Sequence, residues 1–184
     1  MTKFVSIFAA TIFATSAMAQ DALYEDPLPQ DAAFVRAIGL ETTQFFGVDV
    51  PADLGEDYAV LTANSVEGIE PGQYVTLLAD GTVLIEADRS TGSKVLVQFL
   101  NLTEATASLA LADNSVTIIG DIAVNSIGAR EVNPVKVPMA VYAGDAVVGE
   151  AFELTLERGR NPTIIADANG SRVLISEVIR TDLD

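Results

Sequence analysis

The side chains that most often carry covalent catalysis near neutral pH are missing from this sequence. Its 184 residues contain no histidine and no cysteine. A serine nucleophile usually needs an imidazole to activate it, and a cysteine nucleophile needs a thiol, so neither kind of site can be assembled here. Zinc sites depend on the same residue types, and we expect no metal site and no cofactor. The sequence therefore predicts that the chain is not an enzyme.

Carboxylates could still support chemistry in two arrangements. Glu150, Glu153 and Glu157 surround one strand-like segment, whereas a glycosidase needs two acids that face each other across a sugar. The pair Asp113-Asn114 offers oxygens to calcium but lacks the spaced ligands of a calcium loop. Ordinary turn chemistry is the simpler interpretation of that pair.

The segment 129–136 gathers positive charge beside a predicted strand. The candidate partner-binding residues, in this segment and just after it, are Arg130, Glu131, Asn133, Lys136 and Tyr142. The alternative is structural: Arg130 and Glu131 pair locally, and Asn133-Pro134 forms a turn. Surface ion pairs are common and weak, which favours the structural interpretation.

The overall charge limits the possible partners. Ten basic residues stand against 26 acidic ones, and the formal net charge is −16. Such a surface repels nucleic acid and other polyanions on average, so we expect no nucleic-acid partner. The acids either keep the protein soluble or steer a basic partner protein towards it.

The first nineteen residues have the pattern of a secretory signal peptide. Lys3 is followed by an apolar run over 4–14, and Ala17-Met18-Ala19 supplies the small residues of a cleavage site, with cutting between Ala19 and Gln20. The apolar run is shorter than the roughly 20 residues of a membrane span. We therefore expect an exported chain with no membrane span after cleavage.

Beyond this leader the pattern is that of an all-β protein. Short apolar runs alternate with turn residues, and Asp80-Gly81, Gly144-Asp145 and Asn169-Gly170 are dipeptides that favour two-residue hairpin turns. The flanking strands are expected at 74–79 and 82–87, at 139–143 and 146–152, and at 163–168 and 171–179. Pro138 cannot donate to a strand ladder, so its strand should lie at an edge or carry a bulge.

A polar segment near the middle divides the chain. Segment 34–40 resembles 96–102, and 71–75 resembles 133–137 at the same offset of 62 residues, which indicates a weak internal repeat. We expect two small tandem antiparallel β-sandwich domains joined by a short linker. The predicted boundaries are a signal peptide at 1–19, an extended segment at 20–32, an N-terminal sandwich at 33–88, a linker at 89–94 and a C-terminal sandwich at 95–184.

Five segments of the chain form a recognisable series: 22–24, 33–36, 97–102, 130–137 and 140–145. In this order they resemble the AlgF family of periplasmic alginate O-acetylation proteins, and the stretch from 130 to 145 is the most specific. The resemblance implies a periplasmic accessory protein, because the acetyl transfer in that family is assigned to other components that resemble SGNH-type enzymes. It implies acetyltransferase proteins as partners, with at most weak contact to the acetylated polysaccharide.

Two other functions remain open from the sequence. A carbohydrate-binding module would stack sugars on exposed aromatic rings, but the chain has no tryptophan and its tyrosines are scattered. An assembly chaperone of an exopolysaccharide export complex would lend a strand to a partner's sheet edge. The adaptor interpretation agrees best with the missing imidazole and thiol.

Overall fold

The computed structural model describes residues 28–40, 44–50, 54–63, 68–89, 93–175 and 179–180. The elements of this part of the chain are all strands, which confirms the all-β prediction. The strands are β1 (Ala32–Ile38), β2 (Gln44–Phe45), β3 (Val48–Asp49), β4 (Tyr58–Thr62), β5 (Tyr74–Leu78), β6 (Val83–Ile85), β7 (Val95–Asn101), β8 (Ala107–Leu111), β9 (Thr117–Ile122), β10 (Ser126–Val132), β11 (Lys136–Ala143), β12 (Ala146–Thr155), β13 (Thr163–Asp167), β14 (Gly170–Leu174) and β15 (Ile179–Arg180).

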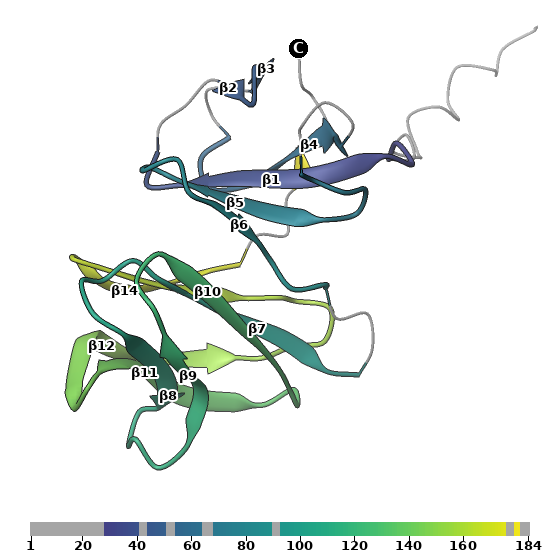
Figure 1. Cartoon of the computed structure of the whole chain (residues 1–184). Coiled ribbons are helices and arrows are strands. Elements are labelled where there is room, and N and C mark those ends of the chain that lie inside the picture. Colours follow the sequence, from purple (N-terminus) through teal and green to yellow (C-terminus); the bar gives the residue numbers. More distant parts are fainter. Residues whose placement is uncertain are drawn as a thin grey trace, which may run out of the picture.

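Three sheets are stacked in layers (Figure 1). The first sheet has the strand order β15-β4-β1-β5-β6, the second β10-β7-β13-β14 and the third β12-β11-β8-β9. A small hairpin of β2 and β3 lies on the far side of the first sheet from the other two (Figure 1). The second sheet therefore sits in the middle and contacts a sheet on each face.

The first and second sheets are built to the same plan. In each, a central strand (β1 or β7) pairs antiparallel with one neighbour (β4 or β10) and parallel with the other (β5 or β13). That parallel neighbour then forms a hairpin with an edge strand, β6 or β14. The register places Arg36 beside Thr76 in the first sheet and Gln98 beside Thr163 in the second.

This plan bears on the weak repeat seen in the sequence. Arg36 and Gln98 occupy corresponding positions of β1 and β7 and are separated by the expected 62 residues. The second half of the match is wrong: 71–75 leads into β5, whereas 133–137 leads into β11 of the third sheet. The true counterpart of β5 is β13. The sequence offset between the two units therefore exceeds 62 residues after β7, because the strands of the third sheet are inserted between β7 and β13.

Alternation along the central strands supplies apolar side chains to both faces of each sheet. Between the first and second sheets pack Ile38, Leu78, Leu100 and Ile165. Between the second and third pack, among others, Val97, Phe99, Leu109, Met139, Val141 and Ile164. The outer face of the first sheet packs Val35, Ala37 and Val75 against Phe45, Val50 and Leu54. Burying each large apolar side chain stabilises the fold by about 1.5–3 kcal/mol, so the contact between the first two sheets is a true core.

The three predicted hairpins are confirmed as β5–β6, β11–β12 and β13–β14, but only Gly144-Asp145 forms the predicted two-residue turn. The β5–β6 turn has three residues, 79–81, and the β13–β14 turn is Ala168-Asn169, one residue earlier than predicted. Gly81 and Gly144 have φ angles of 86° and 61°, the left-handed conformation that these turns need. The strand predicted at 171–179 is too long, because β14 ends at Leu174 and residues 179–180 pair with β4 of the first sheet instead. For Pro138 the edge alternative is wrong and the bulge alternative is right: β11 lies between β12 and β8, and its register with β12 shifts between Met139 and Val141.

The predicted leader at 1–19, with its cleavage site between Ala19 and Gln20, lies outside the described residues, as does most of the segment 20–32. The domain boundaries stay predictions. Two observations bear on them: β15 of the predicted C-terminal domain completes the first sheet, and Arg89 of the predicted linker is half-buried. In the part of the chain that the structure describes, no helix is long and apolar enough to cross a membrane.

Candidate functional site

A ring of five side chains joins the first and second sheets. The Glu86 carboxylate, just after β6, accepts from Arg36 of β1 over 3.0 Å and from Arg89 over 3.1 Å. Across the contact, Arg36 Nη2 donates to Thr163 Oγ1 over 3.0 Å, and Arg89 Nη1 donates to Gln98 Oε1 over 2.9 Å. Thr163 Oγ1 also donates to Gln98 Oε1 over 3.2 Å, which closes what we call the interface ring.

The Glu86 carboxylate is the most heavily bonded member of the interface ring. Its side chain is 0% exposed, and that of Arg36 is 1% exposed. It also accepts from the Tyr58 hydroxyl, 2.8 and 2.9 Å from its two oxygens, and from the Thr76 hydroxyl over 2.6 Å. A buried carboxylate is costly unless its oxygens are bonded and its charge is paired. Two guanidinium groups and two hydroxyls meet both conditions here.

Tyr58 acts as a fixed donor to this carboxylate. Burial of the ring, and then the negative charge of Glu86, raise the pKa of Tyr58 far above its ordinary value of 10.0, while the charges of Arg36 and Arg89 oppose that shift. Its hydroxyl also accepts a hydrogen bond from Arg89. Tyr58 therefore keeps its proton at any physiological pH and cannot serve as a general base.

Arg89 forms the outer rim of the interface ring. Its side chain is 14% exposed, and its guanidinium lies 4.2 Å from the centre of the Tyr74 ring, which itself stacks on Phe34 at 4.4 Å. Among the buried polar side chains of the described residues, only Gln98 Nε2 and Asn161 Oδ1 lack a partner. The ring is thus a nearly saturated structural link, with its charges already committed to one another.

Two of the three glutamates near β12, and Asp113, have partners within the chain. Glu153 pairs with Lys136 at 2.7 Å, and Glu157 pairs with Arg160 at 3.1 Å. Asp113 accepts from the side chain and the backbone N–H of Ser115, and these bonds lower the pKa of Asp113, as expected for a turn. In the described ranges no three histidine, cysteine or acidic side chains come close enough to hold a metal ion.

The candidate partner-binding residues are spread over two sheets. Arg130 and Glu131 lie on β10 of the second sheet, Asn133 follows that strand, and Lys136 and Tyr142 lie on β11 of the third. These residues are neighbours in the sequence, on two consecutive strands, but they belong to different sheets. Their role as a partner-binding surface stays a prediction.

Most of these side chains already have partners within the chain. Arg130 Nη1 donates to the carbonyl of Ile118 over 2.9 Å, so its bond is not to the adjacent Glu131. Asn133 Oδ1 accepts from Lys94 Nζ over 2.5 Å, and the buried Tyr142 hydroxyl donates to the Ala112 carbonyl over 2.8 Å. These contacts give each of the three a structural role.

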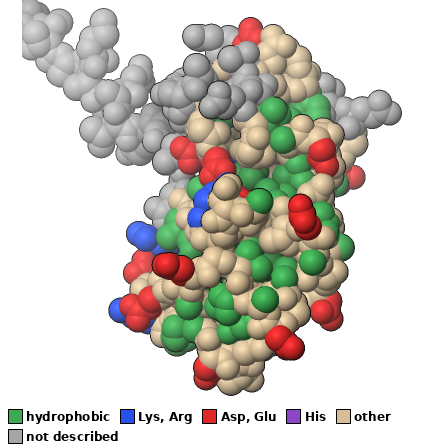
Figure 2. Space-filling view, turned by 90° about the vertical axis from the view of Figure 1, so that its left-hand side faces the viewer, with side chains coloured by type: hydrophobic (Ala, Val, Ile, Leu, Met, Phe, Trp, Pro, Cys, Tyr) green, Lys and Arg blue, Asp and Glu red, His purple; other side chains and the backbone are tan. Residues whose placement is uncertain are grey.

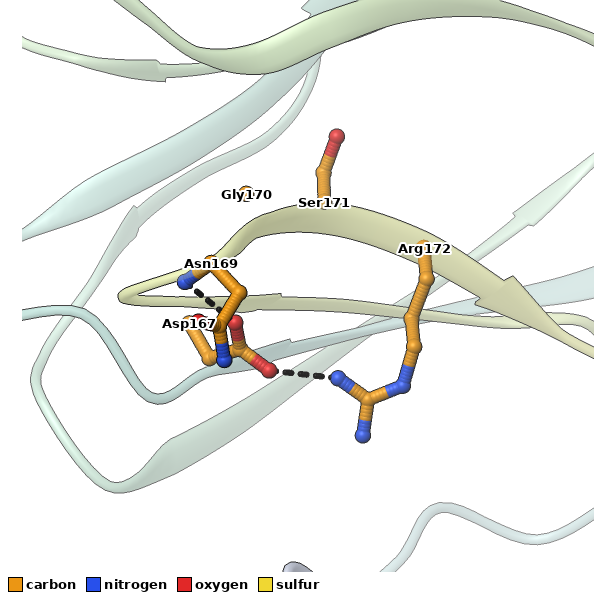
Figure 3. A pocket seen from close by; sticks show the side chains of 5 residues that line it. All are labelled: Asp167, Asn169, Gly170, Ser171 and Arg172. Carbon is orange, nitrogen blue, oxygen red and sulfur yellow. Dashed lines mark hydrogen bonds and ion pairs between the residues drawn. The ribbon is translucent and has the colours of Figure 1, made fainter.

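A shallow pocket lies at the tip of the β13–β14 hairpin (Figure 3). The Arg172 side chain turns back towards Asp167 and pairs with it at 2.5 Å, and its other nitrogen pairs with Glu56 at 2.7 Å. Burial alone would lower the pKa of Arg172, but hydrogen bonds and the charges of Glu56 and Asp167 raise it above its ordinary value. Glu56 precedes β4 of the first sheet, and Arg172 lies on β14 of the second. Their ion pair is therefore a second ionic link between these two sheets.

The interface ring was missed in the sequence, although one signal was present. Arg36 interrupts a strand that is otherwise apolar, and all seven residues of β1 are buried. A charged side chain in a strand of that kind requires a buried partner of opposite charge. No pattern identified Glu86 as that partner, because the two residues lie 50 positions apart.

Comparison with known proteins identifies the family. The family model described as "Alginate O-acetyl transferase AlgF" matches residues 62–163, which is more than half of the chain. The chain belongs to the AlgF family. The match runs from the end of β4 to the start of β13, so it includes Glu86, Arg89, Gln98 and Thr163 of the interface ring.

Named relatives agree with this assignment. The "Alginate biosynthesis protein AlgF" of Pseudomonas putida is 31% identical over 130 residues, which cover 71% of this chain and 55% of the relative. The protein of the same name from Pseudomonas aeruginosa is 25% identical over 167 residues, covering 79% and 77%. The chain thus spans little more than half the length of the first of these relatives.

A solved structure of the C-terminal domain of AlgF from P. aeruginosa is also similar. It is 29% identical, with a TM-score of 0.39, and the match covers 45% of this chain and 96% of that domain.

Proposed function

We propose that this chain is a non-catalytic accessory protein in the O-acetylation of an exported, alginate-like polysaccharide, where it bridges acetyltransferase proteins in the periplasm. Family membership and the names of the relatives support the link to alginate acetylation. The observation that carries the non-catalytic part is the composition of the whole sequence, which has neither a histidine nor a cysteine. Acyl transfer by a hydroxyl or thiol nucleophile ordinarily relies on one of these residues.

Electrostatics support protein partners over tight binding of the polymer. The net charge of −16 repels a polyuronate, and the cations of Lys136 and Arg172 are paired with acids of the chain itself. Figure 2 shows acidic side chains scattered over one face, with the few cations gathered along one side of it. A partner with a basic surface fits such a face better than an anionic chain does.

The carbohydrate-binding alternative finds little support in the described tyrosines. Tyr58 and Tyr142 are buried, and Tyr74 is half-buried against Phe34. A sugar-stacking platform needs an open aromatic face, and none of these three rings offers one.

The test is genetic and chemical. In a strain that exports acetylated polymer, deletion of the gene should lower the acetyl content, and the full-length chain supplied in trans should restore it. The purified protein should neither hydrolyse nor transfer an acetyl ester. Unchanged acetylation in the deletion strain would contradict the accessory role, and unaided ester turnover would contradict its non-catalytic nature.

A further inference from the structure

The edge strand β6 exposes both its backbone and its apolar side chains. It is the last strand of the first sheet, and Figure 1 shows it at the margin of that sheet. The N–H of Leu78 donates to Thr82 O, and that of Glu86 donates to Tyr74 O, so alternate residues of this segment face β5. Val83 and Ile85 fall between them, and their N–H and C=O groups point to the open edge. The two residues are 43% and 53% exposed.

The corresponding strand of the second sheet, β14, is also an edge strand, but it is covered in part; its Ile175, the counterpart of Ile85, is 41% exposed. The register aligns Leu84 with Leu174, since these pair with Thr76 and Thr163 respectively, so Val83 corresponds to Val173. Val173 is partly buried in the core under the third sheet, whereas Val83 is exposed. Edge strand β14 is also met by β12: a Cβ at Gly149 would lie 2.7 Å from the Ser171 nitrogen.

No described strand plays the part of β12 for the first sheet. Its outer face packs against residues of the β2–β3 segment, and β6 pairs only with β5 among the strands that the structure describes. An unpaired edge that carries uncharged β-branched side chains is one that proteins usually protect with charge, proline or a cover. β6 is short, with three residues, but its sequence Val-Leu-Ile contains no charge and no proline.

The charges beside β6 indicate what kind of strand would fit. Exposed Asp80 and Asp88 lie on either side of the strand, and the Thr82 backbone N–H lowers the pKa of Asp80 and so keeps it ionised. If two copies paired antiparallel about Leu84, Asp80 of one copy would lie opposite Asp88 of the other. Like charges in that position oppose pairing, so a second copy is a poor occupant.

We propose that β6 is a docking edge for an extended segment of a basic partner protein, which adds a strand beside Val83 and Ile85 and places cations near Asp80 and Asp88. The partner strand would pair with this open edge, whereas β12 only packs closely against the start of β14. Main-chain hydrogen bonds would supply affinity, and the alternating apolar side chains would supply register. This inference rests on the proposed adaptor function and names the surface that such an adaptor would use.

The test uses the full mature chain and a defined probe, a short synthetic peptide of alternating valine and threonine with a lysine at each end. Amide hydrogen exchange should show new protection at Val83 and Ile85. Val83→Lys and Ile85→Pro should each weaken peptide binding about tenfold or more, through lost side-chain contact or a lost edge donor. The matched control is Val147→Lys, an exposed valine on edge strand β12, which should change binding by no more than about twofold.

Three results would overturn the proposal: equal binding of a peptide with glutamate at each end, protection at strands other than β6, or a dimer of the chain that Ile85→Pro dissolves. Urea midpoints close to that of the unchanged protein would confirm that the variants are folded. The peptide experiment is independent of acetylation in cells. Failure of the deletion test removes the proposed function, whereas failure of the peptide test removes only this docking edge.

Discussion

The replacement Glu86→Gln tests the central structural claim, that a buried carboxylate fastens the first sheet to the second. Glutamine keeps the volume and one acceptor oxygen of the side chain, so the change isolates the negative charge. Arg36 would then be left 1% exposed without its counter-charge, and Arg89 would lose the same partner. Thr76 and Tyr58 would lose a charged acceptor, which weakens their bonds.

The expected loss of folding stability is large because the buried Arg36 is shielded from water, which cannot replace its lost counter-charge. Removing one partner of a buried ion pair usually costs about 3–5 kcal/mol. For a protein of this size we take a urea m-value of about 2 kcal/mol per molar, so the unfolding midpoint should fall by roughly 2 M. That is a substantial share of the about 5–15 kcal/mol that stabilises a typical domain.

The assay is urea unfolding followed by circular dichroism, with Glu153→Gln as the matched control. Glu153 makes an even shorter ion pair with Lys136, at 2.7 Å, but the two side chains are 61% and 60% exposed. An exposed pair of this kind is worth about 0–1 kcal/mol. If both variants shift the midpoint by the same small amount, the reasoning about the interface ring is refuted.

Three further predictions follow from the same structure. Because the pKa of Tyr58 is raised in the fold, its contribution to stability is complete below about pH 10 and declines above that value by about 1.4 kcal/mol per pH unit. Tyr58→Phe should remove this decline when the free energy of unfolding is measured from pH 9 to 11. An unchanged slope in the variant would show that Tyr58 does not cause the decline. Gly149→Ala should lower the free energy of unfolding by about 2–3 kcal/mol, since φ is 75° there and the new Cβ meets the Ser171 backbone. The control Gly144→Ala, at φ 61°, meets nothing within 4 Å and should cost about 1–2 kcal/mol. Equal losses of stability in thermal unfolding would show that the close approach of β12 and β14 is unimportant. Arg172→Met should cost at most about 1 kcal/mol and should abolish part of the salt dependence of stability, which a titration with sodium chloride checks.

The hairpins and the all-β class could be predicted from the sequence because their signals are local. Gly144-Asp145 forms a two-residue turn and Asp80-Gly81 lies in a three-residue turn, and the neighbouring strands follow from alternation. The parallel pairings of β1 with β5 and of β7 with β13 have no such signal, since they join segments 40 and 65 positions apart. The interface ring depends on those pairings, which is why Arg36 could be noticed in the sequence but its partners could not be named.

The shared plan of the first two sheets also indicates where function should be sought. At their mutual contact the two units are alike: Thr76 and Thr163 correspond, as do Leu84 and Leu174, and these positions hold the sheets together. They differ on the outer face of the edge strand, where Val173 packs under the third sheet and its counterpart Val83 is exposed. Structural demands alone would tend to treat equivalent edges alike, because an uncovered apolar edge invites aggregation. The exposed Val83 and Ile85 of β6 therefore agree with the proposed partner strand, and the acids on both sides of β6 favour a basic one.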